Sequence, residues 1–486
     1  MIPIASEFVV DGEGGVTFVG GMSLSQNATN RVRNLIGRAN LGDPRLVRRA
    51  MGLAEALASH PKGSLPQVWS NAAELEAAYR FLRNPRTSFE GLMEAVQLAA
   101  RDAALDAEQV LVLHDTTDVA CQAAEPEEVG FLQTGKPGFY VHHALCVTGD
   151  GRALPLGVPW SQLWGRPQRS RNLGRNRTGS ELAKLKERES DRWLEGITEA
   201  ALWTEGCREV VHVMDREADS ARVFGLLADL SSNFVIRMRH DRRLQDGGFV
   251  AEELAQAPVR FHREIAVSGR HGKTMPRHTH GARNARTTRL SVRAARVDIR
   301  PPRYAETTES IAFNVVQLLE DKPPKGEKPI AWVLATSLPV RTKAQLERVI
   351  DIYRARWVIE EFHKALKTGC MLEKRQLESF ESITTLLAMS YPVAAELLRV
   401  RTRARHPNAR GCDLLRATQL ECLRVHPRAA PLSPDPTAAE VLGVIANLGG
   451  HQKNNGPPGW QTLAAGYQRL LDFEVGWAAA IEARDL

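Results

Sequence analysis

Two aspartates directly follow short apolar runs of the kind found in buried strands. The run from Val110 to His114 precedes Asp115, and the run from Val210 to Met214 precedes Asp215. Such runs predict strands inside a sheet, each ending at its carboxylate. A carboxylate at a strand end often only caps a turn, so each aspartate alone leaves a structural and a catalytic role open. Two such carboxylates close together repel each other unless a cation lies between them, and Mg²⁺ prefers oxygen ligands on a rigid strand.

A third acid, Glu360, lies on a long helix that the sequence predicts from Lys343 to Thr368. Four residues of this helix follow one another at intervals of three, four and seven: Tyr353, Arg356, Glu360 and Lys367. At about 100° per residue, their side chains fall within an arc of roughly 60° on one face. Trp357 and Lys364 flank this arc.

A separate side of the same helix predicts its contact with the core. It carries an apolar stripe made of Ile352, Ala355, Ile359, Phe362 and Leu366. The helix therefore packs by this stripe and presents an acid, aromatic rings and cations elsewhere. Mixed charges alone would fit a solvated face, but tyrosine and tryptophan beside one arginine and two lysines favour a nucleic-acid surface.

The charge of the chain favours a polyanionic partner. The 486 residues carry a formal net charge of +7. From Arg270 to Arg303 there are ten arginines and lysines and a single acid, Asp298. Clustered cations can neutralise phosphates and release counterions, although a solvated basic surface stays open for this run.

The composition predicts a reduced, cytoplasmic protein without a membrane partner. The six cysteines include no CxxC pair, so neither a zinc site nor a disulfide framework is indicated. No signal-peptide pattern is apparent, and no apolar run approaches the roughly 20 residues that a membrane span needs.

The patterns along the chain predict several domains, because 486 residues exceed the size of one core. A strand and helix order of β-β-β-α-β-α-β indicates an α/β sheet of mixed direction. The predicted segments are an irregular N-terminus (hairpin or disordered) at 1–39, a helical domain with a basic face at 40–97, an α/β domain at 98–239 and 329–375, a β-rich insertion at 240–328 and a helical region at 376–486.

Three motifs together resemble the signatures of the insertion-sequence-four (IS-four) family of bacterial transposases. They are D-T-T at 115–117, D-R-E-A-D at 215–219, and the Tyr, Arg, Glu and Lys spaced over 353–367. Further segments are similar to that family: L-G-D-P-R at 41–45, A-Y-R-F-L-R-N-P at 78–85, R-V-I-D-I-Y at 348–353 and R-W-V-I-E-E-F-H-K-A-L-K-T-G at 356–369. The resemblance runs from about Asn40 to the C-terminus.

The resemblance implies an RNase H-like catalytic core in which Asp115, Asp215 and Glu360 hold two Mg²⁺ ions, with Mn²⁺ able to substitute. In a two-metal site, one ion activates the attacking oxygen and the other stabilises the leaving oxygen. The family's reaction is cut-and-paste transposition: cleavage at the transposon ends, hairpin formation and strand transfer into target DNA, with no nucleotide cofactor.

The resemblance also implies particular DNA contacts. Three residues are expected to contact phosphates near the cleaved end: Tyr353, Arg356 and Lys367. Trp332 is expected to stack on a base flipped out of the duplex, with Arg237 beside the same distorted strand. A core position for Trp332 and a surface salt bridge for Arg237 stay open. Two residues complete the expected DNA-binding face: Lys364 and Trp357.

The helical segments receive roles from the same resemblance. Residues 40–97 are expected to bind the DNA ends, and residues 376–486 to form a homodimer. The apolar residues between Ala438 and Leu486 either pack on the catalytic domain or form this interface, with Phe473 and Trp477 as anchors.

Two other interpretations share these residues. A structure-specific nuclease or Holliday-junction resolvase on the same fold would keep the acids without needing the β-rich insertion or the Tyr-Arg-Glu-Lys face. A domesticated, non-catalytic DNA-binding protein would be expected to have lost an acid, whereas all three are present.

Overall fold

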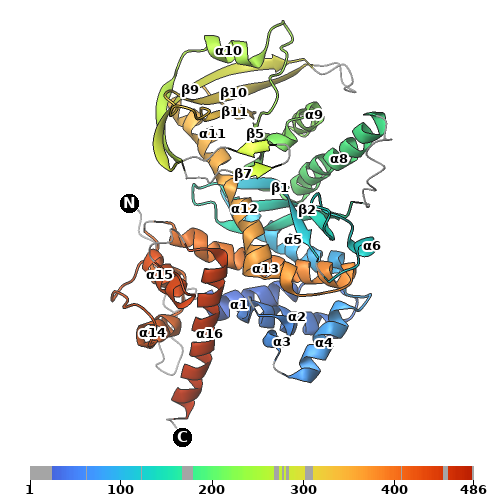
Figure 1. Cartoon of the computed structure of the whole chain (residues 1–486), viewed down its shortest axis with the longest axis vertical. Coiled ribbons are helices and arrows are strands. Elements are labelled where there is room, and N and C mark those ends of the chain that lie inside the picture. The colour runs from blue at the N-terminus through green and yellow to red at the C-terminus, as the bar shows by residue number, and fades with distance from the viewer. Residues whose placement is uncertain are drawn as a thin grey trace.

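A nine-stranded sheet forms the centre of the molecule (Figure 1), in the order β3-β2-β1-β4-β5-β11-β10-β9-β6. The computed structural model describes residues 24–61, 63–69, 71–121, 123–166, 179–267, 273–275, 278–280, 284–300, 310–406, 408–452 and 458–483. The strands of the sheet are β1 (Val110–Ala120), β2 (Gly138–Thr148), β3 (Pro155–Trp164), β4 (Val210–Met214), β5 (Asn233–Arg237), β6 (Phe261–Val267), β9 (Arg286–Ile299), β10 (Ile311–Glu320) and β11 (Ala331–Thr336). A separate ladder joins β7 (Lys273–Met275) to β8 (His278–His280).

The sheet is mixed in direction, as the sequence predicts. β1, β2 and β3 are antiparallel, whereas β4 and β5 run parallel to β1. Beyond β5, every pairing from β11 to β6 is antiparallel. Three strands of the predicted insertion at 240–328, β6, β9 and β10, therefore extend the central sheet, because β10 pairs with β11, whereas β7 and β8 form the separate ladder.

Successive residues of the strands enter different hydrophobic cores. Leu111 and Leu113 of β1 belong to the largest cluster, whereas Val110 and Val112 pack in a cluster that contains Ala200. This alternation follows from the two-residue repeat of a strand. It explains why β1 and β4 are continuous apolar runs, since helices cover both of their faces.

Helices form a layer on each side of the sheet. The long helix α8 (Gly179–Trp203) and α9 (Ala221–Asp229) pack against one side, where Phe224 stacks on Phe313. The largest hydrophobic cluster lies on the other side, and the helices that contribute to it include α5 (Phe89–Leu105), α11 (Lys343–Ala355), α12 (Trp357–Lys364) and α13 (Phe380–Ala404). The helix α10 (Val250–Gln256), within the insertion, was not anticipated from the sequence.

The N-terminal helices are continuous with that cluster. They are α1 (Leu24–Ile36), α2 (Pro44–Ser59), α3 (Leu65–Val68) and α4 (Ala72–Leu82), and below the sheet in Figure 1 they lie beside α13. The expectation of an irregular segment at 1–39 is wrong for α1, in which Val32 and Ile36 face the core. Residues 1–23 lie outside the described residues.

The C-terminal region is helical, as predicted, and begins with a core helix. α13 is the one described helix long and apolar enough to cross a membrane by length and composition, and 78% of its apolar window is buried inside the protein. This burial marks it as a core helix. It is followed by α14 (Ala417–Val425), α15 (Ala438–Leu448) and α16 (Trp460–Glu482).

Short helical turns occur between these elements. They are α6 (Pro126–Val129), the 3₁₀ turns η1 (Arg216–Ala218), η3 (Leu372–Lys374) and η4 (Gly411–Asp413), and the π turn η2 (Ala365–Gly369).

Two glycines allow α15 and α16 to cross in direct backbone contact. A Cβ atom at Gly449 would lie 1.8 Å from the carbonyl oxygen of Thr462, and one at Gly466 would lie 1.7 Å from that of Ile445. Since the blocking atoms are backbone, a methyl group there forces the helices apart.

We predict that Gly466→Ala destabilises the protein by about 1–3 kcal/mol, the range for overpacking a tight contact. The matched control is Gly443→Ala on α15, where an added Cβ meets nothing within 4 Å. That control should be neutral or slightly stabilising, because alanine favours a helix over glycine. Urea unfolding measures both, and equal stability of Gly466→Ala and the wild type would contradict the close crossing.

Candidate active site

Asp115 and Asp215 lie on neighbouring parallel strands at matching positions. Leu113 of β1 is paired with Val213 of β4, and each aspartate lies two residues further along the chain, Asp115 within β1 and Asp215 directly after β4. β4 ends at Met214, so Asp215 directly follows a strand, as predicted. The prediction that Asp115 also ends its strand is wrong, because β2 continues to pair with β1 as far as Ala120.

A backbone amide holds each of these carboxylates. The Asp115 carboxylate accepts a hydrogen bond from the Thr116 amide at 2.9 Å. The Asp215 carboxylate caps η1 by accepting one from the Glu217 amide at 2.7 Å. Both side chains are therefore oriented by the chain that follows them.

Glu360 reaches the same place from α12 and is linked to Asp115 by one arginine. The guanidinium of Arg356 lies 2.7 Å from the Glu360 carboxylate and 3.6 Å from that of Asp115. Arg356 follows the last residue of α11 and precedes α12, so the single long helix predicted from Lys343 to Thr368 is interrupted there.

The electrostatics of Asp115 reflect how closely the acids gather. Burial raises its pKa to about 7. Arg356 and the amide of Thr116 oppose this rise. The negative charges of Asp215 and Glu360 add to it. Asp215 and Glu360 thus each lie near enough to Asp115 to raise its pKa.

The donor set fits divalent cations by its chemistry, since it consists of carboxylate oxygens whose mutual repulsion a cation would relieve. Among the described residues, however, no group of three or more acidic, histidine or cysteine side chains is gathered as a ready metal cluster. Arg356 occupies the space between two of the acids in this structure.

Three of the predicted DNA contacts form a row leading away from Arg356. The Trp332 and Tyr353 rings meet edge to face, with centroids 5.5 Å apart. The guanidinium of Arg237 lies over Trp332, 5.8 Å from the ring centroid, and donates to the Ala331 carbonyl at 3.2 Å. Trp332 is only partly buried, whereas Tyr353 is buried.

The three remaining predicted contacts lie on α12 and the π turn. Lys367, in η2, binds Asp118 at 2.7 Å. Lys364 lies over the exposed Trp357 ring, 5.4 Å from its centroid, and binds Glu361 at 3.1 Å. The wider π turn ends the regular helix, and such turns are frequent at functional sites.

Asp219 was not assigned a role from the sequence, although it closes the D-R-E-A-D motif. Its buried carboxylate accepts the amides of Arg239 and His240 at 2.6 and 2.8 Å. It also forms an ion pair with Arg242 at 2.5 Å. Asp219 therefore ties the turn after Asp215 to the segment after β5.

Part of the predicted basic run is neutralised within the fold. Arg286 forms ion pairs with Glu320 and Glu327, and Arg289 lies 3.8 Å from Asp321. Arg296 is exposed. Four of the ten cations lie outside the described residues: Arg270, Arg277, Arg283 and Arg303.

Five buried histidines lie on β1, β2, β4 and α12, and the sequence patterns did not identify them as a group either. They are His114, His142, His143, His212 and His363. His114 and His212 share a hydrogen bond of 2.9 Å, and His143 bonds to His363 at 3.2 Å and to the Tyr391 hydroxyl at 3.0 Å. A single histidine inside an apolar run does not indicate such a network, because the other members lie on strands and a helix far apart in the sequence.

Burial keeps these histidines neutral. It lowers the pKa of His143 to about 3 and that of His212 to about 4. The pKa values of the other three are lowered well below the ordinary value by the same cause. The strands that lead to Asp115 and Asp215 therefore carry neutral polar groups, His114 and His212, in their buried parts.

Two family models match this chain. Residues 29–87 match one described as Transposase DNA-binding, and residues 188–391 match one described as Transposase DDE domain. The second match contains Asp215 and Glu360, and Asp115 precedes it. The chain thus combines a transposase DNA-binding domain with a DDE transposase domain, a class of domain that generally uses divalent metal ions. These domains support an enzyme that acts on DNA in transposition.

We predict that the free energy of unfolding falls as the pH is lowered from 7.5 to 5.5. Unfolding restores an ordinary histidine pKa of about 6.5, so below that pH the unfolded chain binds more protons. The raised pKa of Asp115 acts in the opposite direction between about pH 4 and 7, but it is one group against five. Urea unfolding at the two pH values measures the difference.

His143→Gln should reduce this pH dependence, since one buried histidine contributes up to about 1.4 kcal/mol per pH unit. The control is His406→Gln, because His406 is exposed. If His143→Gln kept the full pH dependence, the buried histidines would not be its source.

Proposed function

We propose that this protein is an IS-four-type transposase, related to the transposase of transposon five, that cuts and pastes DNA with two divalent metal ions. The observation that carries this proposal is the register that sets Asp115 beside the position of Asp215, together with Arg356, which joins Asp115 to Glu360. The transposase domain matches favour it over a structure-specific nuclease.

The strand arrangement supports an RNase H-like core. The order β3-β2-β1-β4-β5, with three antiparallel strands followed by two parallel to β1, is the arrangement expected of that fold. The acids then lie where such a core offers them, on two adjacent central strands and on a helix across the sheet. The remaining strands extend this core on the β5 side.

Asp115, Asp215 and Glu360 would hold two Mg²⁺ ions. When bound, the ions supply an activated oxygen nucleophile and stabilise the leaving oxygen. The chain's own part is to orient the carboxylates by the Thr116 and Glu217 amides and to keep their surroundings neutral.

The cations and rings on the open side would hold the DNA strand. Arg356 would bind a phosphate oxygen in place of the Glu360 carboxylate. Lys367 would release Asp118 and bind another phosphate oxygen. Trp332, with Tyr353 behind it and Arg237 beside it, would receive an extruded base, as hairpin formation requires. Lys364 and Trp357 would widen the same surface.

End recognition is proposed for α2 and its surroundings. Three exposed arginines of α2, Arg45, Arg48 and Arg49, line a hollow of about 550 Å³ together with Trp69. This hollow lies within the residues that match the transposase DNA-binding model.

A second copy of the chain is proposed to cover the far end of α16. Val475, Trp477 and Ile481 are 73%, 39% and 47% exposed, and Phe473 stacks on Trp477 with centroids 6.1 Å apart. In Figure 1 this end of α16 extends away from the rest of the molecule. A homodimer would hold two DNA ends, each cut by the partner subunit.

The central test replaces each acid in turn by alanine. Asp115→Ala, Asp215→Ala and Glu360→Ala should each abolish Mg²⁺- or Mn²⁺-dependent cleavage of transposon-end DNA, because a two-metal site loses a ligand. DNA binding, measured by gel shift, should remain largely intact. Asp229→Ala, at the exposed end of α9, serves as the control and should cleave normally. Cleavage by any of the three variants at the wild-type rate would refute the assignment.

A second test addresses the DNA-binding arginines. The triple replacement of Arg45, Arg48 and Arg49 by alanine should weaken end binding and reduce the dependence of log K on log salt by about three. Arg152→Ala is the control, since Arg152 is bound to Asp150 in an exposed hairpin. An unchanged salt dependence would exclude α2 from the DNA interface.

A further inference from the structure

Glu361 is a buried carboxylate immediately after Glu360 on α12. Only 5% of the residue is exposed. Consecutive helical residues point about 100° apart, so Glu361 faces away from the acids while Glu360 faces them. A charge this deeply buried requires partners that satisfy it.

Its partners come from three helices. Lys364, on α12 itself, binds one carboxylate oxygen at 3.1 Å. Arg401 of α13 lies 3.0 Å from the other oxygen, and Arg405, which directly follows α13, lies 3.7 Å from it. The Trp460 indole N–H donates to that same oxygen at 3.1 Å.

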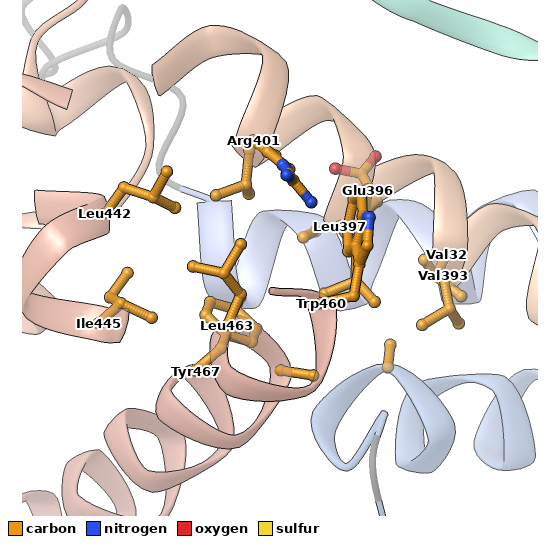
Figure 2. A pocket seen from close by; sticks show the side chains of 14 residues that line it. Val32, Val393, Glu396, Leu397, Arg401, Leu442, Ile445, Trp460, Leu463 and Tyr467 are labelled. Atoms are coloured by element: carbon orange, nitrogen blue, oxygen red, sulfur yellow. The ribbon is translucent and has the colours of Figure 1, made fainter. Parts of the chain in front are cut away.

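Trp460 is the first residue of α16, and its own position is fixed. The residue is 6% exposed, and the Arg401 guanidinium lies over its ring, 4.7 Å from the centroid. Figure 2 shows Trp460 and Arg401 together at a small cavity of about 40 Å³ between α1, α13, α15 and α16. The glycine crossing with α15 holds the next turns of α16 in place.

We infer that Glu361 is a positioning residue: it fastens α12, and through it Glu360, to α13 and to the start of α16. The catalytic consequence of this link rests on the proposed function. The link itself is a property of the protein without DNA. The position of Glu360 thereby depends, through the Glu361 carboxylate, on how α13 and α16 dock against α12.

Two variants interrupt the link with little change of shape. Glu361→Gln keeps the size of the side chain and removes the charge that Arg401 and Lys364 neutralise. Trp460→Phe removes the indole N–H and retains an aromatic ring for Arg401. Glu396→Gln is the matched control, because Glu396 is a largely buried carboxylate of α13 whose ion pairs are with Arg31 of α1 and Arg399 of α13.

Hydrogen exchange of the DNA-free protein measures the link directly. The amides of residues 357–364 should exchange about tenfold faster in Glu361→Gln and in Trp460→Phe, as expected for the loss of a hydrogen bond to a charged group. The double variant should add little to the larger single effect, because both changes break one interaction. Glu396→Gln should leave these amides unchanged.

Single-turnover cleavage at saturating transposon-end DNA measures the consequence. Both variants should lower the rate by about 10- to 100-fold, as for a catalytic group displaced by about an ångström. The dissociation constant for the DNA should stay within about twofold. A purely structural defect would instead weaken binding and lower the rate together with the melting temperature.

The two measurements separate the possible failures. Unchanged exchange of residues 357–364 in both variants, or an equal increase in Glu396→Gln, overturns the inference. Faster exchange with an unchanged cleavage rate overturns the positioning role. If the wild-type protein cleaves no transposon end, the proposed function fails, and the exchange measurement still decides whether Glu361 holds α12.

Discussion

Charge repulsion at Asp115 is the constraint on which the candidate site depends, because Asp215 and Glu360 lie close enough to its partly buried carboxylate to raise its pKa. The register of β1 and β4 fixes Asp115 beside Asp215, and α12 brings in Glu360. Such a group is tolerated only if positive charge is near, and here Arg356 supplies it. The pKa of Asp115 is still raised to about 7, so this single guanidinium offsets only part of the effect of burial and of the neighbouring negative charges.

Neutral and cationic groups both occur near the acids. The buried histidines of β1, β2, β4 and α12 stay uncharged because burial lowers their pKa values. Arg356 is paired with Glu360 and Asp115, Lys367 is paired with Asp118, and the rings of Trp332 and Tyr353 contact each other. Fixed cations behind the carboxylates would weaken their hold on a metal ion, whereas cations in front can also hold an approaching phosphate. Under the proposed function, Arg356 would both offset the charge of the acids and bind a phosphate of the DNA.

The sequence predicts best what local patterns determine. The apolar runs before Asp115 and Asp215, and the stripe on the helix carrying Glu360, identify strands and a helix that the structure contains. What local patterns miss depends on partners distant in the chain. The extension of β1 past Asp115 needs β2, the joining of the insertion to the central sheet needs β11, and the burial of Glu361 needs α13 and α16. A lone glutamate after Glu360 reads as a solvated charge until those helices are in place.

The same dependence on distant partners gives α16 two ends with different contacts. Trp460 meets the carboxylate of Glu361 at one end, and Trp477 is exposed near the other. Seventeen residues of helix separate them, a rise of roughly 25 Å at 1.5 Å per residue. A helix is stiff over that length, so a contact that fixes the exposed end also restricts how Trp460 can leave Glu361. Pairing of two subunits through α16 would therefore stabilise the placement of Glu360 in each of them, without any residue of the interface touching DNA.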